Sequence, residues 1–323
     1  MTVRIGTSGW SYPEGRGTWS GIFYPRRGVR GFRASDELSF YAEHFDTVEV
    51  NSTFYRQPAA PTTARWVAQT PAGFEFSVKL YQAFTHVTPV GRGVAPAVTA
   101  RPASAIPRPA PGETDLFKAG IDPIVESGKL GAVLVQFPPG FHCNPESLEY
   151  VSGLLDALRD YPVAVELRHR SWSDAATITT ELLGRFQAAW VQIDEPKFRF
   201  SIRQDLAPNL QRFSYMRLHG RNAAQWWSPD AAEDRYNYLY SREELKPFAA
   251  AATIGRSDER KAYLYLNNHF AAKAVVNAAV LKHELGQPVP GEYRQEMLDA
   301  YPELRAIVSP SSLLDLGSPS RPD

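Results

Sequence analysis

Val163-Ala164-Val165-Glu166-Leu167-Arg168 is the stretch of sequence that decides the fold. It alternates aliphatic side chains with small or charged ones, as a strand does when successive side chains point to opposite faces. The aliphatic face suits packing against helices, which leaves Glu166 and Arg168 on the other face. The stretch therefore predicts a strand of an α/β protein whose interior face carries charge at its carboxyl end.

Seven further runs of this kind alternate with segments that have helical periodicity or capping signals. The runs are Arg4–Gly9, Thr47–Phe54, Phe74–Tyr81, Ala132–Phe137, Ala189–Asp194, Ser214–His219 and Ala262–Asn268. Asn144-Pro145-Glu146 predicts the start of a helix, and Ser241-Arg242-Glu243-Glu244 has the pattern of a capping box. Such alternation predicts parallel strands, and eight of them favour a single (β/α)8 TIM barrel. No G-x-G-x-x-G follows any run, which disfavours a dinucleotide-binding fold.

The expected barrel covers residues 1–308, with one interruption and one tail. The interruption is a Pro/Ala-rich insertion at about 91–113, whose five prolines exclude a regular helix. We expect this insertion to be disordered, with a lid over the barrel as the alternative. The Ser/Pro-rich residues 309–323 predict a loose C-terminal tail.

Composition excludes several classes of protein. Hydrophobic residues make up 43% of the 323, which suffices for a large core. Lys+Arg and Asp+Glu are both 35, so bulk positive charge cannot attract nucleic acid, although a local basic cleft remains open. Cys143 is the sole cysteine, so no internal disulfide forms. No run is apolar enough to predict a membrane segment, and we expect a cytoplasmic protein.

The alternation of faces also predicts which side chains point into the barrel. Each aliphatic face is assigned to the helices, and the opposite face to the interior. The polar residues so placed are Glu49, Asn51, Ser77, Lys79, Gln136, Glu166, Arg168, Gln192, Asp194, Tyr215, Arg217, His219, Tyr263, Tyr265 and Asn267. Three acids and three bases are therefore expected near the carboxyl ends of the strands, where barrel active sites form. The alternative is a salt-bridge plug, although apolar packing is often equally stable.

Ordered motifs along most of the chain resemble those of one protein family. They are Gly6-Thr7-Ser8-Gly9-Trp10-Ser11-Tyr12, Gly21-Ile22-Phe23-Tyr24-Pro25, Val48-Glu49-Val50-Asn51-Ser52-Thr53-Phe54-Tyr55, Lys79, Thr85-His86, Gln136-Phe137-Pro138-Pro139, Glu166-Leu167-Arg168-His169-Arg170-Ser171-Trp172, Arg217-Leu218-His219-Gly220 and Asn267-Asn268-His269. From about Arg4 to Leu285 the chain resembles the YecE-like family, domain of unknown function seventy-two. The resemblance implies a TIM barrel and no established biochemistry. Phe270-Ala271-Ala272 departs from it, because a glycine is expected after His269.

Three kinds of chemistry fit the predicted interior. Glu49 and Glu166 could serve as an acid–base pair, as in glycoside hydrolysis, but the fourth and seventh strands carry Gln136 and His219 instead of acids. The acids and histidines could hold a divalent metal, against which the neighbouring Lys and Arg would compete. The Arg and Lys groups could bind an anion, since guanidinium forks match phosphate and carboxylate. The last is the best supported ligand class.

The leading hypothesis is an enzyme that acts on a phosphate-bearing or other anionic substrate, with nucleotides and nucleic acid among the candidates. The expected catalytic residues are Glu49, Glu166, Asp194 and His219. The expected substrate-binding residues are Lys79, Arg168, Arg217, Asn51, Asn267, Trp10, Tyr55 and Gln136. No resident metal or cofactor is expected. The alternatives are a binding module without catalysis, for nucleic acid or protein, and a metal-dependent hydrolase resembling barrel endonucleases.

Overall fold

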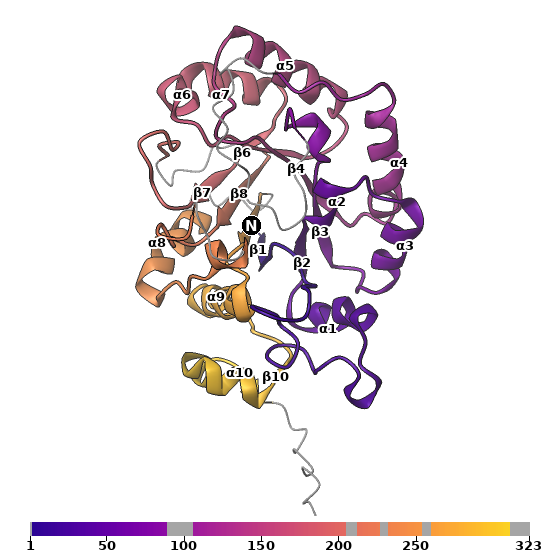
Figure 1. The fold of residues 1–323 in the computed structure, drawn as a ribbon, viewed down its shortest axis with the longest axis vertical. Coiled ribbons are helices and arrows are strands. Elements are labelled where there is room, and N and C mark those ends of the chain that lie inside the picture. Colours follow the sequence, from indigo (N-terminus) through magenta and orange to yellow (C-terminus); the bar gives the residue numbers. More distant parts are fainter. Residues whose placement is uncertain (1, 89–105, 205–211, 227–231, 254–259, 311–323) are drawn as a thin grey trace, which may run out of the picture.

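The parallel strands follow one another around the centre of the molecule (Figure 1). The structure is a computed structural model that describes residues 2–88, 106–204, 212–226, 232–253 and 260–310. The strands of its two main sheets are β1 (Thr2–Thr7), β2 (Thr47–Val50), β3 (Glu75–Lys79), β4 (Leu130–Gln136), β5 (Val163–Glu166), β6 (Ala189–Trp190), β7 (Gln192–Asp194), β8 (Phe213–Leu218) and β9 (Lys261–Leu266). All eight predicted runs are confirmed as strands. The sixth is divided into β6 and β7 at Val191.

The strand order is consistent with a (β/α)8 barrel. One sheet runs β2-β3-β4-β5-β6 and the other β7-β8-β9-β1, with every pairing parallel. The sheets adjoin at a parallel bridge between Ser8 and Glu49, and at the chain's passage from β6 to β7. The α/β class with parallel strands is thus confirmed. The ladder consists of two sheets, not one uninterrupted ring.

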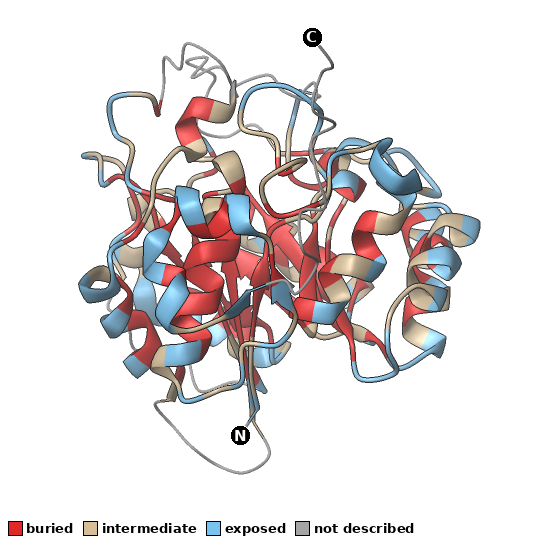
Figure 2. Cartoon of the chain, turned by 90° about the horizontal axis from the view of Figure 1, so that it is seen from below, coloured by how far each residue is buried: buried red, intermediate tan, exposed pale blue. Residues whose placement is uncertain are grey.

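Helices surround these strands and present their buried faces to them (Figures 1 and 2). They are α1 (Glu37–His44), α2 (Ser52–Tyr55), α3 (Ala60–Ala68), α4 (Glu113–Glu126), α5 (Pro145–Ala157), α6 (Arg170–Asp174), α7 (Ala176–Arg185), α8 (Arg242–Thr253), α9 (Lys273–Glu284) and α10 (Gln295–Ala300). Two predicted helix starts are confirmed. Asn144 Oδ1 accepts a 2.8 Å hydrogen bond from Ser147 N, and Ser241 exchanges hydrogen bonds with Glu244. These caps satisfy backbone donors that the first helical turn leaves free.

The second predicted strand is shorter than expected. β2 ends at Val50, and Ser52–Tyr55 turns into α2. Asn51 precedes this turn with helical backbone angles. The turn carries Asn51 and α2 to the rim at the carboxyl ends of the strands, instead of continuing the strand to Phe54.

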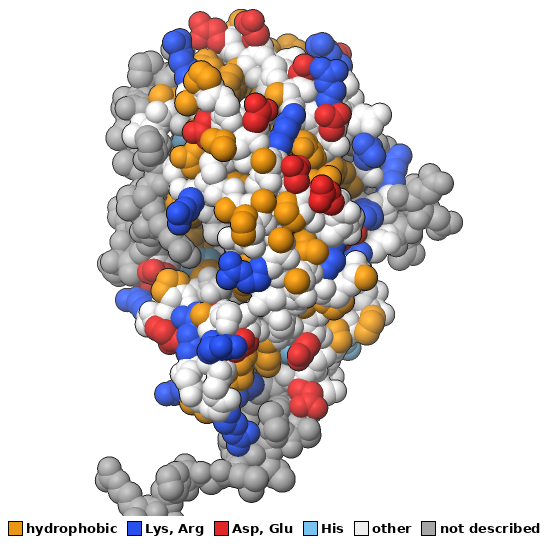
Figure 3. Space-filling view, turned by 90° about the vertical axis from the view of Figure 1, so that its right-hand side faces the viewer, with side chains coloured by type: hydrophobic (Ala, Val, Ile, Leu, Met, Phe, Trp, Pro, Cys, Tyr) orange, Lys and Arg blue, Asp and Glu red, His pale blue; other side chains and the backbone are white. Residues whose placement is uncertain are grey.

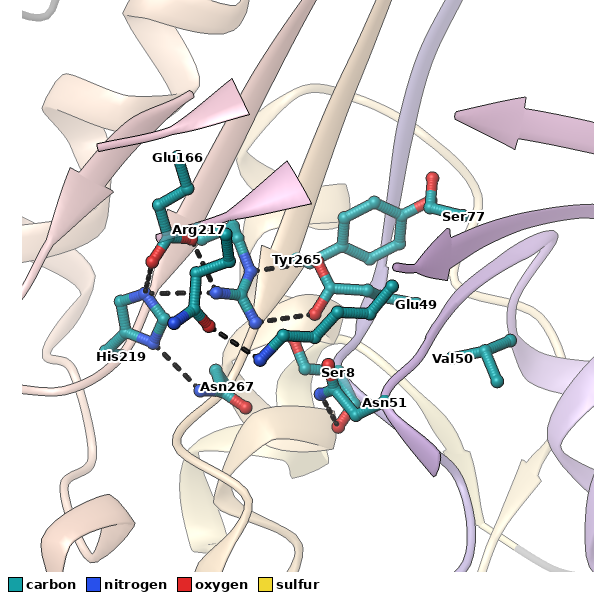
Figure 4. Close-up of polar contacts among 12 residues, drawn as sticks. Ser8, Glu49, Val50, Asn51, Ser77, Glu166, Arg217, His219, Tyr265 and Asn267 are labelled. Carbon is teal, nitrogen blue, oxygen red and sulfur yellow. Dashed lines mark hydrogen bonds and ion pairs between the residues drawn. The ribbon is translucent and has the colours of Figure 1, made fainter. Parts of the chain in front are cut away.

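The strand registers show which side chains share a face, because paired residues of parallel strands point the same way. Glu49 pairs with Ser77, Gln136 with Glu166, and Arg217 with Tyr265. These pairings confirm the predicted interior positions on β2, β3, β4, β5, β8 and β9. Val50, the neighbour of Glu49, points away from the charged cluster in Figure 4.

The expected inward direction of Gln192 and Asp194 is wrong. Ile193 pairs with Arg217 and therefore shares the interior face, whereas Asp194 pairs with Leu218 on the helix side. The rule assigned the aliphatic face to the helices, but in this strand position both faces are buried and Ile193 lies inside. Glu195, one residue further on, then takes the interior direction that was assigned to Asp194.

Two sequence predictions fall largely outside the described residues. Of the expected insertion at 91–113, the structure describes only residues 106–113, the last of which begins α4. Of the expected tail at 309–323, it describes Ser309–Pro310 (β11), which pairs with Glu292–Tyr293 (β10). None of the helices in the described part of the chain has the length and apolar character needed to cross a bilayer.

Candidate functional site

A buried ion cluster forms the floor at the carboxyl ends of the strands (Figure 4). Arg217 donates from Nε and Nη2 to the two carboxylate oxygens of Glu49, at 2.9 and 2.7 Å. Its Nη1 lies 2.5 Å from Glu166 Oε2. The Tyr215 hydroxyl donates to Glu49 Oε2 at 2.7 Å. Because all three charged side chains are at most 1% exposed, the cluster satisfies its own charges within the protein.

Arg168 lies above this floor and is half-buried. Its Nε donates to Glu166 Oε1 at 2.6 Å, and its Nη2 lies 3.2 Å from His219 Nε2. His219 is fully buried, and its Nδ1 lies 2.8 Å from the side-chain amide of Asn267. Arg168 is therefore the guanidinium of the cluster with the larger accessible part, at 15% of its side chain against 1% for Arg217.

Lys79, the last residue of β3, is a half-buried amine without a carboxylate partner among the described residues. Its Nζ donates to Gln136 Oε1 at 2.6 Å and lies 4.0 Å from the centre of the Phe54 ring. Burial, with the nearby positive charge of Arg217, lowers the pKa of Lys79 to about 7. The amine is therefore close to half protonated near neutral pH.

Two neighbouring histidines, His219 and His86, also have lowered pKa values, caused by burial and by nearby positive charges. Burial, together with the charges of Arg217 and Arg168, lowers the pKa of His219 to about 3. Burial likewise lowers the pKa of His86 to about 3, with Lys79 and Arg168 acting in the same direction. Burial raises the pKa of Glu166, but Arg217 and Arg168 outweigh it and hold that pKa well below its usual value. Both histidines are neutral at pH 7, and Glu166 is ionised.

Glu195 is the site residue that the sequence reasoning missed. Its side chain is 5% exposed, and its Oε2 lies 3.5 Å from Arg168 Nη1 without accepting a hydrogen bond among the described residues. Burial raises the pKa of this carboxyl group, against the attraction of Arg168. Assigning Ile193 instead of Asp194 to the interior face of the sixth strand would have placed Glu195 in the interior as well.

Asp194 belongs to a different set of contacts. Its two oxygens accept hydrogen bonds from Arg221 at 2.8 and 3.0 Å, and the Tyr240 hydroxyl donates to Oδ2 at 2.7 Å. These partners hold the connection that follows β8 against the outside of the strands. Asp194 is thus a positioning residue of a loop, and its predicted place in the catalytic set is not supported by these contacts.

Of the other predicted binding residues, some lie at the rim and others pack against neighbouring aromatic rings. Gln136 holds Lys79, as described above. Asn51 donates to Ser8 O at 3.3 Å, and its Oδ1 is buried without a hydrogen-bond partner among the described residues. The Trp10 ring packs edge-on against Trp66 at 5.4 Å. Tyr55 is 37% exposed at the end of α2 and packs against Phe54.

The arrangement offers little to a metal ion. Glu49 and Glu166 have their oxygens taken by guanidinium and hydroxyl donors. Across the described ranges, no three His, Cys, Asp or Glu side chains are grouped so that they could hold a metal. The site's chemistry therefore lies with the amine, the guanidinium and the buried carboxyl.

Comparisons with known proteins agree on one family. Residues 4–298 match the family described as "Protein of unknown function DUF72". The chain is 28% identical over 283 residues to UPF0759 protein YunF of Bacillus subtilis (strain 168), covering 85% of this chain and 92% of that protein. A crystal structure of a DUF72 family protein from Thermotoga maritima MSB8 is 30% identical, with a TM-score of 0.69 over 89% of this chain and 100% of the other.

A second solved structure, of a DUF72 family protein from Enterococcus faecalis V583, is similar to a comparable degree. It is 25% identical, with a TM-score of 0.70, and the alignment covers 88% of this chain and 96% of that one. The descriptions of this family and of these relatives name no substrate or reaction. The likeness therefore extends to sequence family and fold, and the chemistry has to be argued from the side chains.

Proposed function

Since this chain belongs to the DUF72 family, for which the comparisons name no activity, we propose a function from its own residues. The proposal is an enzyme that transfers protons on a small anionic substrate, bearing phosphate or carboxylate, at the carboxyl ends of the strands. The observation that carries it is Lys79: an amine in the interior, beside Arg168 and Arg217, with no carboxylate to neutralise it among the described residues.

The anion is held by Arg168 and Lys79. Arg217 was expected to share this task, but its fork is occupied by Glu49 and Glu166 inside the floor. Arg168 is the guanidinium that keeps exposed area. Burial is the main cause of the lowered pKa values of Lys79 and His219, and the charges of Arg217 and Arg168 act in the same direction; a bound anion would oppose both.

Proton transfer falls to Lys79 and Glu195. A general acid or base works best when its pKa lies near the working pH, and the pKa of Lys79 is lowered to about 7. Burial raises the pKa of Glu195 above its ordinary value. Surroundings that lower the pKa of an amine and raise the pKa of a carboxyl group are typical of acid–base pairs. Glu49 and Glu166 then act as fixed charges that position Arg217 and Arg168.

The nucleic-acid alternative has less support. On the face shown in Figure 3, basic side chains are interspersed with acidic ones, and no area of a single sign stands out. The net charge of zero agrees with this view. Binding to a polyanion depends on several neutralised phosphates, and the face in Figure 3 has no cluster of cations to supply them. The small-anion hypothesis needs only the few cations at the rim.

Calorimetric titration of the full chain with inorganic phosphate tests the proposal, together with a turnover screen of phosphorylated and carboxylated metabolites. We expect Arg168→Met to weaken phosphate binding about tenfold or more, because the partly exposed positive charge at the rim is lost. We expect Lys79→Met and Glu195→Gln each to reduce turnover by about a hundredfold or more, as for a lost acid or base. Lys246→Met, an exposed lysine on α8, is the matched control.

The outcomes separate the parts of the proposal. Phosphate binding that is the same in wild-type protein and Arg168→Met would remove the anion site. Turnover that survives both Lys79→Met and Glu195→Gln would remove the proposed acid–base groups. A gel shift with nucleic acid that disappears in Arg168→Met would favour the binding module instead.

A further inference from the structure

Arg235 is a buried arginine without an ion pair among the described residues. It lies in the 3-10 helix η4 (Ala232–Tyr236), within the connection between β8 and α8, and is 8% exposed. Its Nε and Nη2 atoms are shielded from solvent and have no hydrogen-bond partner in the part of the chain that the structure describes. Its recorded contact is with Trp226, whose ring centre lies 5.7 Å below the guanidinium carbon. Neither the described protein nor bulk water satisfies this edge of the guanidinium.

Other arginines show how unusual this state is. Arg4 and Arg294 also leave a buried Nε without a hydrogen bond. Each nevertheless has a carboxylate partner, Arg4 in Asp46 and Glu75, and Arg294 in Glu296. A buried charge without a partner costs several kcal/mol, roughly, even after relaxation. Because burying Arg235 without a partner lowers the stability of the fold, we look for a role of this side chain in binding.

The unsatisfied edge has the geometry of an anion receptor. Nε and Nη2 are the two parallel donors that bind both oxygens of one carboxylate or two oxygens of one phosphate. The guanidinium lies over the Trp226 ring, at a distance suited to a cation–π contact. Trp226 also lies 6.5 Å from the His219 ring, and His219 contacts Arg168. The edge thus belongs to the same end of the molecule as the proposed site.

The position of Arg235 in the fold is also one where anions bind in other barrels. β8 is the seventh strand position of the barrel order, and barrels often bind phosphate in the loop that follows this position. Arg221, in the same connection, is already paired with Asp194 and Glu244. Among the described residues of this connection, Arg235 is the cation whose donors remain unused.

We infer that Arg235 binds an anionic group of the substrate, a phosphoryl or carboxylate group, at a second position distinct from the rim formed by Lys79 and Arg168. The inference rests on the proposed function for the substrate being anionic. It adds that the substrate carries two anionic groups, one held by Arg168 and the other by Arg235. The reacting end lies at Lys79, and the group at Arg235 fixes its orientation.

Arginine Nε–Hε resonances of the full chain, followed by NMR during titration with inorganic phosphate, test the inference. The Arg235 signal is identified by its absence in Arg235→Lys, which keeps the charge but loses the fork. We expect the Arg235 signal to shift with phosphate. We expect Arg235→Met to weaken binding at this position about tenfold or more, with exposed Arg65→Met on α3 as the matched control.

Stability supplies an independent readout. A ligand that binds the native state raises Tm, so phosphate should raise the Tm of the wild-type protein. Without phosphate, Arg235→Met should be as stable as wild type or more so, because it removes an unpaired buried charge. With phosphate, its Tm gain should be smaller. An arginine with a purely structural role would instead lose stability on substitution and show no response to phosphate.

The results distinguish this inference from the proposed function. A phosphate response at Arg235 with none at Arg168 supports the second position and contradicts the rim site. A response at Arg168 with none at Arg235 overturns the inference and leaves the proposed function standing. If Arg235→Met fails to fold, the wild-type signal and Arg235→Lys still decide, because an unmoved Arg235 resonance at saturating phosphate overturns the inference.

Discussion

The interior of the barrel carries a charged cluster at each end, and the two clusters differ in how completely their groups are paired. At the amino ends of the strands, Glu75 accepts from Lys261 at 2.7 Å and from the Tyr263 hydroxyl at 2.6 Å, with Arg4 at 3.1 Å. Arg4 also binds Asp46. Each charged group in this cluster has an opposite partner, and Lys261 and Asp46 reach solvent.

The cluster at the carboxyl ends has a paired floor and an incompletely paired rim. Arg217 and Arg168 together balance the charges of Glu49 and Glu166, but Lys79 meets no carboxylate in the described residues, and Glu195 accepts no hydrogen bond there at Oε2. Charge inside a barrel is therefore a poor guide to function when taken alone. Hydrogen-bonding capacity that the protein leaves unused is a better one.

The largest expected effect comes from breaking the floor. Arg217→Met leaves Glu49 and Glu166 buried without their shared partner, and removing one member of a buried ion cluster costs about 3–5 kcal/mol in free energy of unfolding. Lys261→Met at the amino ends should cost about 1 kcal/mol or less, since that lysine is 47% exposed. Chemical denaturation of both variants measures the difference. Equal losses would contradict the division between the ends.

A second pair of variants compares two buried carboxyls. Glu75→Gln loses charge-assisted contacts with Arg4, Lys261 and Tyr263, so we expect it to lower the free energy of unfolding by about 2 kcal/mol. Glu195→Gln should change stability by less than about 0.5 kcal/mol, because its one ionic contact is long and its charge is disfavoured by burial. A larger loss for Glu195→Gln would make Glu195 a structural residue.

The pH dependence of stability provides a third comparison. The pKa of Lys79 is lowered from 10.5 to about 7 in the folded protein, so the unfolded chain binds more protons between these values. Stability from this group therefore rises with pH from about 7 to about 10.5, and its penalty is fully present below about pH 7. Subtracting the profile of Lys79→Met from that of wild type isolates this slope. A flat difference profile would show that Lys79 titrates normally.

The smallest expected effect concerns backbone strain at the carboxyl end. Ala271 and Ala272 have φ of 50° and 64°, in the region that glycine adopts without a Cβ penalty. Ala271→Gly should raise stability by about 0.5 kcal/mol, the relief of strain less the entropy of glycine. Ala250→Gly in α8 should lower it by about 1 kcal/mol. Thermal unfolding of both variants measures whether each substitution raises or lowers stability. A lower stability of Ala271→Gly would show that the backbone of Ala271 is not strained.

Much of the fold could be predicted from the sequence because the strand signal is periodic. Alternation placed Glu49, Glu166 and Arg217 on the interior face, and the registers confirm it. The same rule failed at Asp194, because a strand buried on both faces gives no contrast between aliphatic and polar sides. Glu195 was missed for this reason alone.

The site could be predicted less well than the fold. Residue types showed that acids and bases would meet, but which of them pair depends on side-chain geometry across strands distant in sequence. Arg217 was expected to bind substrate and is instead enclosed by Glu49 and Glu166. Arg235 lies in an irregular connection, where periodicity carries no information about direction. Its lack of a partner is visible only in three dimensions.

The most direct test of the difference between the two ends is an NMR pH titration of the lysine side chains, with and without inorganic phosphate. The pKa of Lys79 should lie at about 7 without phosphate and should rise when phosphate binds, because an anion favours the ammonium form. Lys261, paired with Glu75 at the other end, should not respond to phosphate. A Lys79 pKa near the ordinary lysine value of about 10.4, unmoved by phosphate, would contradict this prediction.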